Sequence, residues 1–262
     1  MLIFVLEIYL RAKSPSIRVK PLKRRKIYTY QGRGASQNYI DGSKQSFAAA
    51  VPWLKQEFID AAGIKRGDFK QDGAVLNVSG GIGSRFYLAD WGADGLQQID
   101  DFIFNGGVYT GWCAGGTPLF PLTEFALGTP EEKIGNGINL CGGRAVGPEH
   151  PGYDSYSMAG ACASPVGWEK GKLSAFFNGG CAFVDLDSNA EVIARYEQSN
   201  RAAIVEIKHG QGLAIASGIH IEMPVATLDK TNPHIGAIHA ELVANEGERQ
   251  RLFYHLTRRA NL

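Results

Sequence analysis

Short apolar runs alternate with amphipathic segments in the first half of the chain. Apolar, β-branched and aromatic residues predict buried strands at 27–30, 74–78 and 107–112. Apolar residues spaced three or four positions apart predict helices at 44–62 and 95–105, and a short helix at 114–125. Strands and helices that alternate with short connections indicate βαβ units, and therefore a parallel sheet.

The second half of the chain has a different pattern. Short strand candidates, separated by turn residues, lie at 173–177, 182–186, 192–196, 202–208 and 213–217. The last two are expected to form a hairpin across His209-Gly210-Gln211-Gly212, and a helix is expected at 235–258. The pattern predicts an α/β fold with a mostly parallel central sheet flanked by helices, and extra β-hairpins in the second half.

Residues 1–25 differ from the remainder of the chain. The apolar run 1–10 is interrupted by Glu7 and is shorter than the about 20 residues that cross a bilayer. Basic residues follow this run instead of preceding it, unlike in a secretory signal. We expect 1–25 to be a loosely attached, flexible extension, with a targeting or membrane-tethering segment as the alternative. We expect 26–262 to be a single domain.

Composition narrows the function classes. Apolar residues make up 44% of the 262 residues, charged residues 20%, and the net charge is +1, which gives no indication of a nucleic-acid or membrane-surface partner. The four cysteines are too few and too scattered for a disulfide scaffold, so reduced thiols and a cytoplasmic location are expected. No Cys/His spacing is typical of a zinc site, and neither a metal nor an organic cofactor is implied. Three of the thiols are expected to be structural: Cys141, Cys162 and Cys181.

The fourth cysteine occupies a turn that is typical of a nucleophile. Cys113 follows a predicted strand in Gly111-Trp112-Cys113-Ala114-Gly115, where small flanking residues let strand and helix backbones approach closely. A thiol at the start of a helix is favoured as thiolate, and the Ala114 amide points to where an oxyanion forms. An inert buried cysteine is the alternative interpretation of this turn alone.

Two further motifs provide partners for this cysteine. Gly80-Gly81-Ile82-Gly83 follows the strand at 74–78 and is therefore expected at the same sheet edge, where its backbone amides can supply a second oxyanion donor, with a glycine-rich turn without a partner as the alternative. Far downstream, His220 and Glu222 lie two residues apart and face one side of an extended chain. Glu222 is then placed to orient His220, and His220 to polarise Cys113.

The order of these motifs resembles the class I glutamine amidotransferase superfamily. The closer resemblance is to the amidotransferase-like N-terminal domain of eukaryotic-type biotin–protein ligases, which also occurs as a stand-alone protein. It covers about 27–222 and is carried by the Gly80-Gly81 loop, the elbow segment 106–116 (GGVYTGWCAGG), the segment 176–185 (FFNGGCAFVD) and the segment 153–160 (YDSYSMAG).

The resemblance implies a flavodoxin-like fold and gives each motif residue a role. It implies Cys113 as nucleophile, His220 as base and Glu222 as its orienting acid, with Gly81 and Ala114 as the oxyanion hole. Pocket residues implied in the same way are Gly80, Tyr153 and Asn178. One position departs from the family pattern, because Ile221 replaces the usual proline between the histidine and the glutamate and removes a fixed φ.

Three functions remain open at this stage. The first is a cysteine-dependent amidase or amidotransferase-like hydrolase that acts on a small-molecule or amide substrate through a thioester. The second is a non-catalytic binding or regulatory domain that keeps the fold, with an unidentified partner subunit. The third is a redox role for Cys113. Biotin ligation is not expected, because only 40 residues follow Glu222.

Overall fold

Parallel strands, all but one of them from the first half of the chain, form one side of a large sheet. The computed structural model describes residues 26–71, 73–154 and 156–262, so the extension expected at 1–25 lies outside the described residues. Neighbouring strands on this side are β2 (Lys55–Ile59), β1 (Lys26–Tyr30), β3 (Ala74–Val78), β4 (Val108–Trp112) and β13 (Gly212–Ser217). All pairings in this series are parallel.

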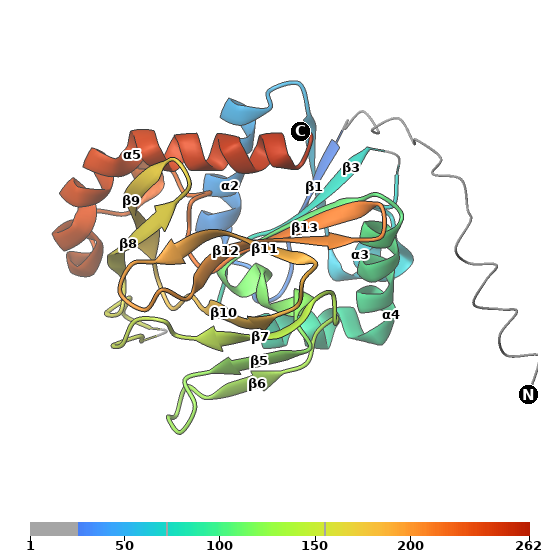
Figure 1. Ribbon diagram of the computed structural model, residues 1–262, viewed down its shortest axis with the longest axis horizontal. Coiled ribbons are helices and arrows are strands. Elements are labelled where there is room, and N and C mark those ends of the chain that lie inside the picture. The colour runs from blue at the N-terminus through green and yellow to red at the C-terminus, as the bar shows by residue number, and fades with distance from the viewer. Residues whose placement is uncertain (1–25, 72, 155) are drawn as a thin grey trace, which may run out of the picture.

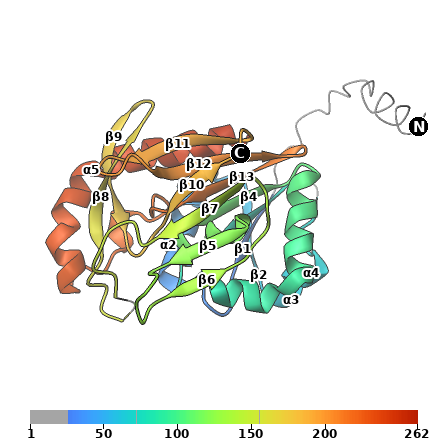
Figure 2. The same cartoon turned by 60° about the horizontal axis from the view of Figure 1, so that its bottom comes forward.

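Strands that pair mostly antiparallel extend the sheet beyond β13. The order continues through β12 (Ala202–His209), β10 (Ala182–Leu186), β7 (Gly142–Gly147), β5 (Leu122–Phe125) and β6 (Lys133–Gly135), and in this series β5 and β7 pair parallel. A branch leaves β12 through β11 (Ala190–Tyr196), β8 (Cys162–Trp168) and β9 (Gly171–Phe177). The hairpin predicted at 209–212 is confirmed, because β12 and β13 pair antiparallel on either side of it. Figures 1 and 2 show this half curving away from the parallel strands.

Helices cover both faces of the parallel strands. Figure 1 shows α2 (Gln37–Ala50) and α5 (Pro233–Arg259) together on one side, and α3 (Ala61–Arg66) and α4 (Ser84–Phe104) on the other. A hydrophobic core lies on each face of these strands, one beneath α3 and α4 and the other beneath α2 and α5. Successive residues of β3 point to opposite faces, so Leu76 packs into the first core and Val75 into the second. The predicted α/β architecture, with a parallel central sheet flanked by helices, is confirmed. No helix within the described ranges is both long and apolar enough to cross a membrane.

Two predicted helices are wrong. The helix expected over 44–62 ends at Ala50, since Pro52 cannot donate a helical hydrogen bond, and the chain then forms strand β2. Phe58, which falls within the predicted helix, lies on strand β2, where its ring is 46% exposed beneath the Lys44 ammonium. The helix expected over 114–125 is replaced by two short 3₁₀ turns and strand β5, because glycines and Pro118 interrupt it.

Candidate functional site

Cys113 lies on a tight turn at the end of β4, as the elbow pattern predicts. Its φ is 50°, a left-handed conformation that costs a non-glycine residue of order 1–3 kcal/mol. A methyl group built on Gly111 would lie 2.3 Å from the Gly115 carbonyl oxygen, and one on Gly115 would lie 2.1 Å from the Val78 carbonyl oxygen. Both flanking glycines are therefore required for this close passage of backbones. The following turn, Cys113–Gly115, is too short for the helix dipole that the sequence suggested.

His220 and Glu222 form a buried pair immediately after β13. Both side chains are fully buried, and His220 Nδ1 lies 2.8 Å from Glu222 Oε1. A proton on Nδ1 that is donated to the carboxylate leaves Nε2 available as a base. Burial alone lowers the pKa of His220, but the Glu222 carboxylate and the Cys113 sulfur raise it and prevail. The pair therefore favours a protonated imidazole whenever a negative charge develops beside it.

The histidine ring is held by aromatic contacts that the sequence did not reveal. The Tyr39 ring stacks on His220 with centroids 4.3 Å apart and planes inclined by 7°. The Tyr39 hydroxyl accepts a hydrogen bond of 3.1 Å from Asn178 Nδ2, and the His220 amide donates to the Phe176 carbonyl oxygen at 2.9 Å. These contacts fix the plane of the imidazole before any substrate binds.

Cys113 and His220 share one small space behind the glycine loop. A methyl group built on Gly80 would lie 2.6 Å from His220 Cε1 and 3.5 Å from Cys113 Cβ. The thiol points toward the carbonyl oxygens of Asn178 (3.8 Å) and Gly179 (4.0 Å). Within the described part of the chain, His220 Nε2 has no hydrogen-bond partner. The structure thus brings the predicted cysteine, histidine and glutamate together at one sheet edge, with Nε2 unengaged.

The turn between the histidine and the glutamate is fixed without proline. Ile221 is fully buried, and its carbonyl oxygen accepts a hydrogen bond from Arg249 Nη1 of α5. The same guanidinium reaches Ser46 Oγ at 3.2 Å and forms two bonds, of 2.8 and 2.7 Å, to the Glu246 carboxylate. Packing and this arginine take over the constraint that a proline would provide.

A narrow cavity of about 40 Å³ opens at the thiol. Its walls come from four regions: Gly81, Ile82, Gly83 and Ser84; Cys113, Ala114 and Thr117; Thr123, Phe125, Lys133 and Tyr153; and Asn178, Gly179, Gly180 and Cys181. Neither Gly81 nor Ala114 donates its amide to a backbone carbonyl within the described segments. Both amides therefore remain available at the wall where an oxyanion hole was predicted.

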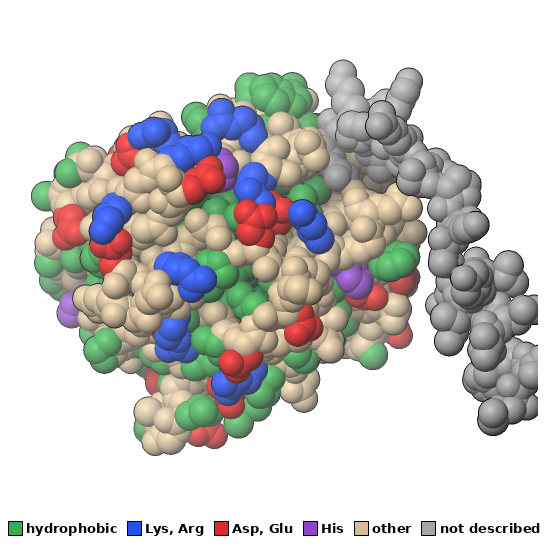
Figure 3. All heavy atoms as spheres, in the orientation of Figure 1, with side chains coloured by type: hydrophobic (Ala, Val, Ile, Leu, Met, Phe, Trp, Pro, Cys, Tyr) green, Lys and Arg blue, Asp and Glu red, His purple; other side chains and the backbone are tan. Residues whose placement is uncertain are grey.

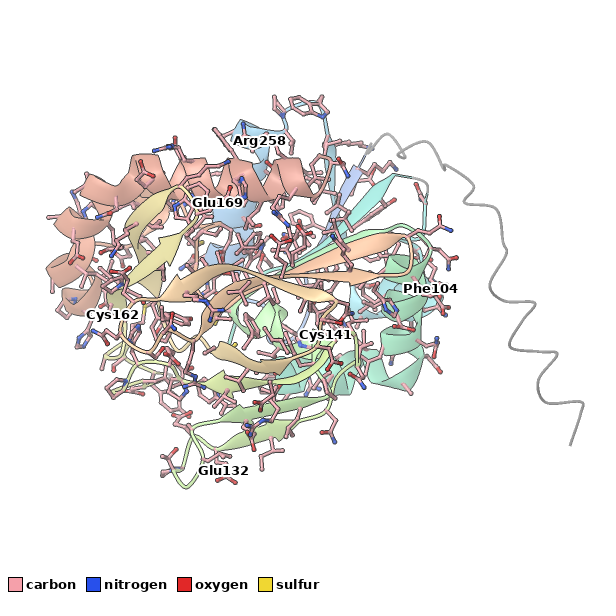
Figure 4. The ribbon with its side chains drawn as sticks, viewed as in Figure 1. Phe104, Glu132, Cys141, Cys162, Glu169 and Arg258 are labelled. Carbon is pink, nitrogen blue, oxygen red and sulfur yellow. The ribbon has the colours of Figure 1, made fainter. Side chains whose placement is uncertain are left out.

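The other predicted pocket residues are only partly at the cavity. Tyr153 and Asn178 line the cavity, whereas Gly80 is not a wall residue and instead packs against the His220 ring. Cys181, expected to be structural, is also part of the wall, and burial raises the pKa of its thiol well above the usual range. All four thiols are free, and Cys141 and Cys162 lie far apart in Figure 4. Across the described residues, no group of three or more His, Cys, Asp or Glu side chains could hold a metal ion.

Acidic and basic side chains are mixed over the surface. Figure 3 shows them interspersed on one face of the molecule, with exposed apolar groups between them. Several pair directly, such as Arg144 with Glu124 (2.6 Å) and Asp185 (2.8 Å), and Lys172 with Glu197 (2.9 Å). We therefore expect a specific ligand to be recognised in the cavity rather than by the charged side chains of this face.

The fold is that of a flavodoxin-like α/β protein, with its cysteine elbow at the carboxyl edge of the parallel strands. A family model described as biotin-protein ligase, N terminal, matches residues 25–262. The chain belongs to this family.

Individual relatives agree with this assignment. A biotin–protein ligase of Schizosaccharomyces pombe is 28% identical over 211 residues, which cover 75% of this chain and 33% of that enzyme. An uncharacterised protein of Chlamydia muridarum is 29% identical over 217 residues, covering 75% of this chain and 80% of that one. The chain thus matches about a third of the yeast ligase. Among solved structures, an exo-β-1,4-mannosidase from Opitutaceae bacterium strain TAV5 aligns with a TM-score of 0.45 at 8% identity, covering 88% of this chain and 36% of that one.

Proposed function

We propose that this protein is a cysteine-dependent acyl-transfer enzyme that hydrolyses or transfers an amide of a small molecule. The observation that carries the proposal is the buried hydrogen bond of 2.8 Å between His220 Nδ1 and Glu222 Oε1, beside Cys113. A histidine oriented by a carboxylate, with its other nitrogen unengaged next to a strained cysteine turn, is the arrangement that activates a nucleophile.

In the first half of the reaction, His220 Nε2 accepts the thiol proton and Cys113 Sγ attacks the substrate carbonyl carbon. The carbonyl oxygen becomes an oxyanion, and we assign its stabilisation to the amides of Gly81 and Ala114, both of which line the cavity. As the carbon–nitrogen bond breaks, the imidazolium returns its proton to the leaving amine. Glu222 stabilises the transient imidazolium, in line with the raised pKa of His220.

In the second half, the cysteinyl thioester is resolved by water or by another acceptor. His220 removes a proton from the incoming nucleophile, and the thiolate leaves and regains that proton. The Cys113 thiol lies near the Asn178 and Gly179 carbonyl oxygens and also interacts with His220, whose pKa it raises. Catalytic hydrogen bonds of unliganded sites commonly tighten when substrate binds, which would align Sγ and Nε2 for proton transfer.

A second candidate is a non-catalytic binding domain, with a partner subunit as its ligand. The observation that favours it is that the Cys113 thiol lies 3.8 and 4.0 Å from the Asn178 and Gly179 carbonyl oxygens, which as acceptors favour a thiol that keeps its proton. In that case the cavity recognises a ligand and no thioester forms.

Acylation by p-nitrophenyl acetate separates the two candidates. The enzyme is expected to release p-nitrophenolate in a burst, as Cys113 becomes S-acetylated, and then in a slower steady phase. Cys113→Ala should abolish the burst, and His220→Gln should slow it by about 10²-fold or more. Cys162→Ala is the matched control, because that partly exposed thiol lies away from the cavity. A burst of equal size in Cys113→Ala would eliminate the enzyme proposal.

A further inference from the structure

One cation lies in the wall of the reactive cavity. Lys133 of β6 contributes to the same cavity as Cys113, and only 14% of its side chain is exposed. Its ammonium lies 4.9 Å from the centre of the Phe125 ring and 5.7 Å from that of Tyr153. A methyl group built on Gly83 would lie 3.8 Å from Lys133 Nζ. The side chain therefore runs along two aromatic rings and ends near the start of α4.

Among the described residues, the positive charge of Lys133 has only a distant carboxylate as its ion-pair partner. The Glu131 carboxylate lies 3.8 Å from it, which is the outer limit of an ion pair. Burial lowers the pKa of Lys133, and the neighbouring Arg85 acts in the same direction. Cys113 has the opposite effect, so the thiol and the ammonium lie within electrostatic reach of each other. A partly buried cation is stabilised by an anion that displaces the remaining water around it.

The start of α4 adds to the positive character of the same wall. Its N-cap residue, Gly83, which precedes Ser84, provides no side-chain cap, and the first turn contains no acidic residue. The amides of this turn therefore direct a partial positive charge at the cavity, where Gly83 and Ser84 are wall residues.

We propose that Lys133 and the first turn of α4 form a carboxylate-binding subsite for the substrate of Cys113. The substrate is then an acyl compound that carries a carboxylate within a few bonds of the carbonyl that Cys113 attacks. This deepens the proposed function and depends on it. A carboxylate can reach the Lys133 ammonium and the first turn of α4 together, because Gly83, Ser84 and Lys133 line the same cavity. Cationic analogues are excluded by repulsion from the same ammonium.

Two alkylating reagents of nearly equal size test the subsite. Iodoacetate carries a carboxylate and iodoacetamide a neutral amide in the same position. The measured quantity is the ratio of their rates at Cys113, divided by the same ratio at Cys162 and resolved by peptide mass spectrometry. Lys133→Gln is expected to lower this normalised ratio by roughly three- to tenfold, the effect of one partly buried charge pair. Lys133→Arg should preserve it. Lys172→Gln, which removes a lysine that is 75% exposed and paired with Glu197, should leave it unchanged.

The outcomes distinguish the subsite from the proposed function. An unchanged ratio in Lys133→Gln, with Cys113 still reacting fast, would overturn the subsite and leave the nucleophile standing. If Cys113 reacts no faster than Cys162, the proposed role of Cys113 as a nucleophile is rejected. The carboxylate subsite is then tested by titrating the protein with succinate. Binding of succinate that is lost in Lys133→Gln and kept in Lys172→Gln would support the subsite. Equal binding in the unaltered protein and Lys133→Gln, or none in either, would overturn it.

Discussion

Replacing Gly80 by alanine should disable the site although no proposed reacting group is itself replaced. The added methyl carbon would lie 2.6 Å from His220 Cε1, whereas carbon atoms in contact lie about 3.5–4.0 Å apart. The imidazole must therefore retreat by about 1 Å. It cannot do so freely, because the Tyr39 ring is stacked on it and also lies 3.3 Å from the new methyl position. Gly80 is not among the glycines with positive φ, so the backbone itself accepts alanine.

The magnitude follows from this forced displacement. A misplacement of about 1 Å in a catalytic group costs about 10²-fold in rate, and overpacking a buried site costs about 1–3 kcal/mol of stability. We expect Gly80→Ala to lower the rate of Cys113 alkylation by iodoacetamide by about 10²-fold. The midpoint of urea unfolding should fall as well.

The matched control is Gly247→Ala in α5. A methyl group there meets no atom within 4 Å, so the variant should keep full thiol reactivity and gain about 0.5–1 kcal/mol from its higher helix propensity. If Gly80→Ala retains the alkylation rate and stability of the unaltered protein, the reasoning about the shared space between Cys113 and His220 is refuted.

Two further substitutions test the support of the histidine. Glu222→Gln removes a buried charge partner of His220, and at about pH 6 it should cost about 3–5 kcal/mol in urea unfolding. The pKa of His220 is raised in the folded protein, so the stability that the His220–Glu222 ion pair contributes is fully present below the unfolded pKa of about 6.5. It is lost as pH rises through the folded pKa of His220. A cost of Glu222→Gln that does not change with pH would contradict this ion pair. Arg249→Met leaves the buried Ile221 carbonyl oxygen without a hydrogen-bond donor, so it should lower the free energy of unfolding by about 1–3 kcal/mol. It should also slow Cys113 alkylation, and an unaltered alkylation rate would show that Arg249 does not position His220.

The sequence predicted the parts of the fold and site that local chemistry determines. The elbow at Cys113 could be recognised because its glycine pattern is local in sequence, and Gly111 has its closest contact with Gly115, four residues away. The hairpin at 209–212 and the long final helix were likewise predicted from local signals. The order of glycine loop, elbow and His220-x-Glu222 then indicated one sheet edge, where the structure places them together.

What the sequence missed depends on contacts between distant segments. Tyr39 stacks on His220 across 181 positions of chain, and Arg249 reaches Ile221 from the final helix; no motif marks either residue. Lys133 lies on the short edge strand β6, which pairs with β5. The sequence pattern predicted a helix at 114–125, where β5 lies, and therefore did not predict this pair of strands. Strand β2 was missed since Phe58 happens to continue the helical spacing beyond the point where α2 ends.

The rate of Cys113 alkylation near pH 6, in the unaltered protein and in His220→Gln, tests the central claim most directly. An unassisted thiol, with a pKa of about 8.5, reacts slowly at this pH, because little of it is thiolate. We expect Cys113 to react much faster than Cys162 in the unaltered protein, and His220→Gln to remove most of this advantage. Equal rates at the two cysteines, or a fast rate at Cys113 that survives the loss of His220, would contradict it.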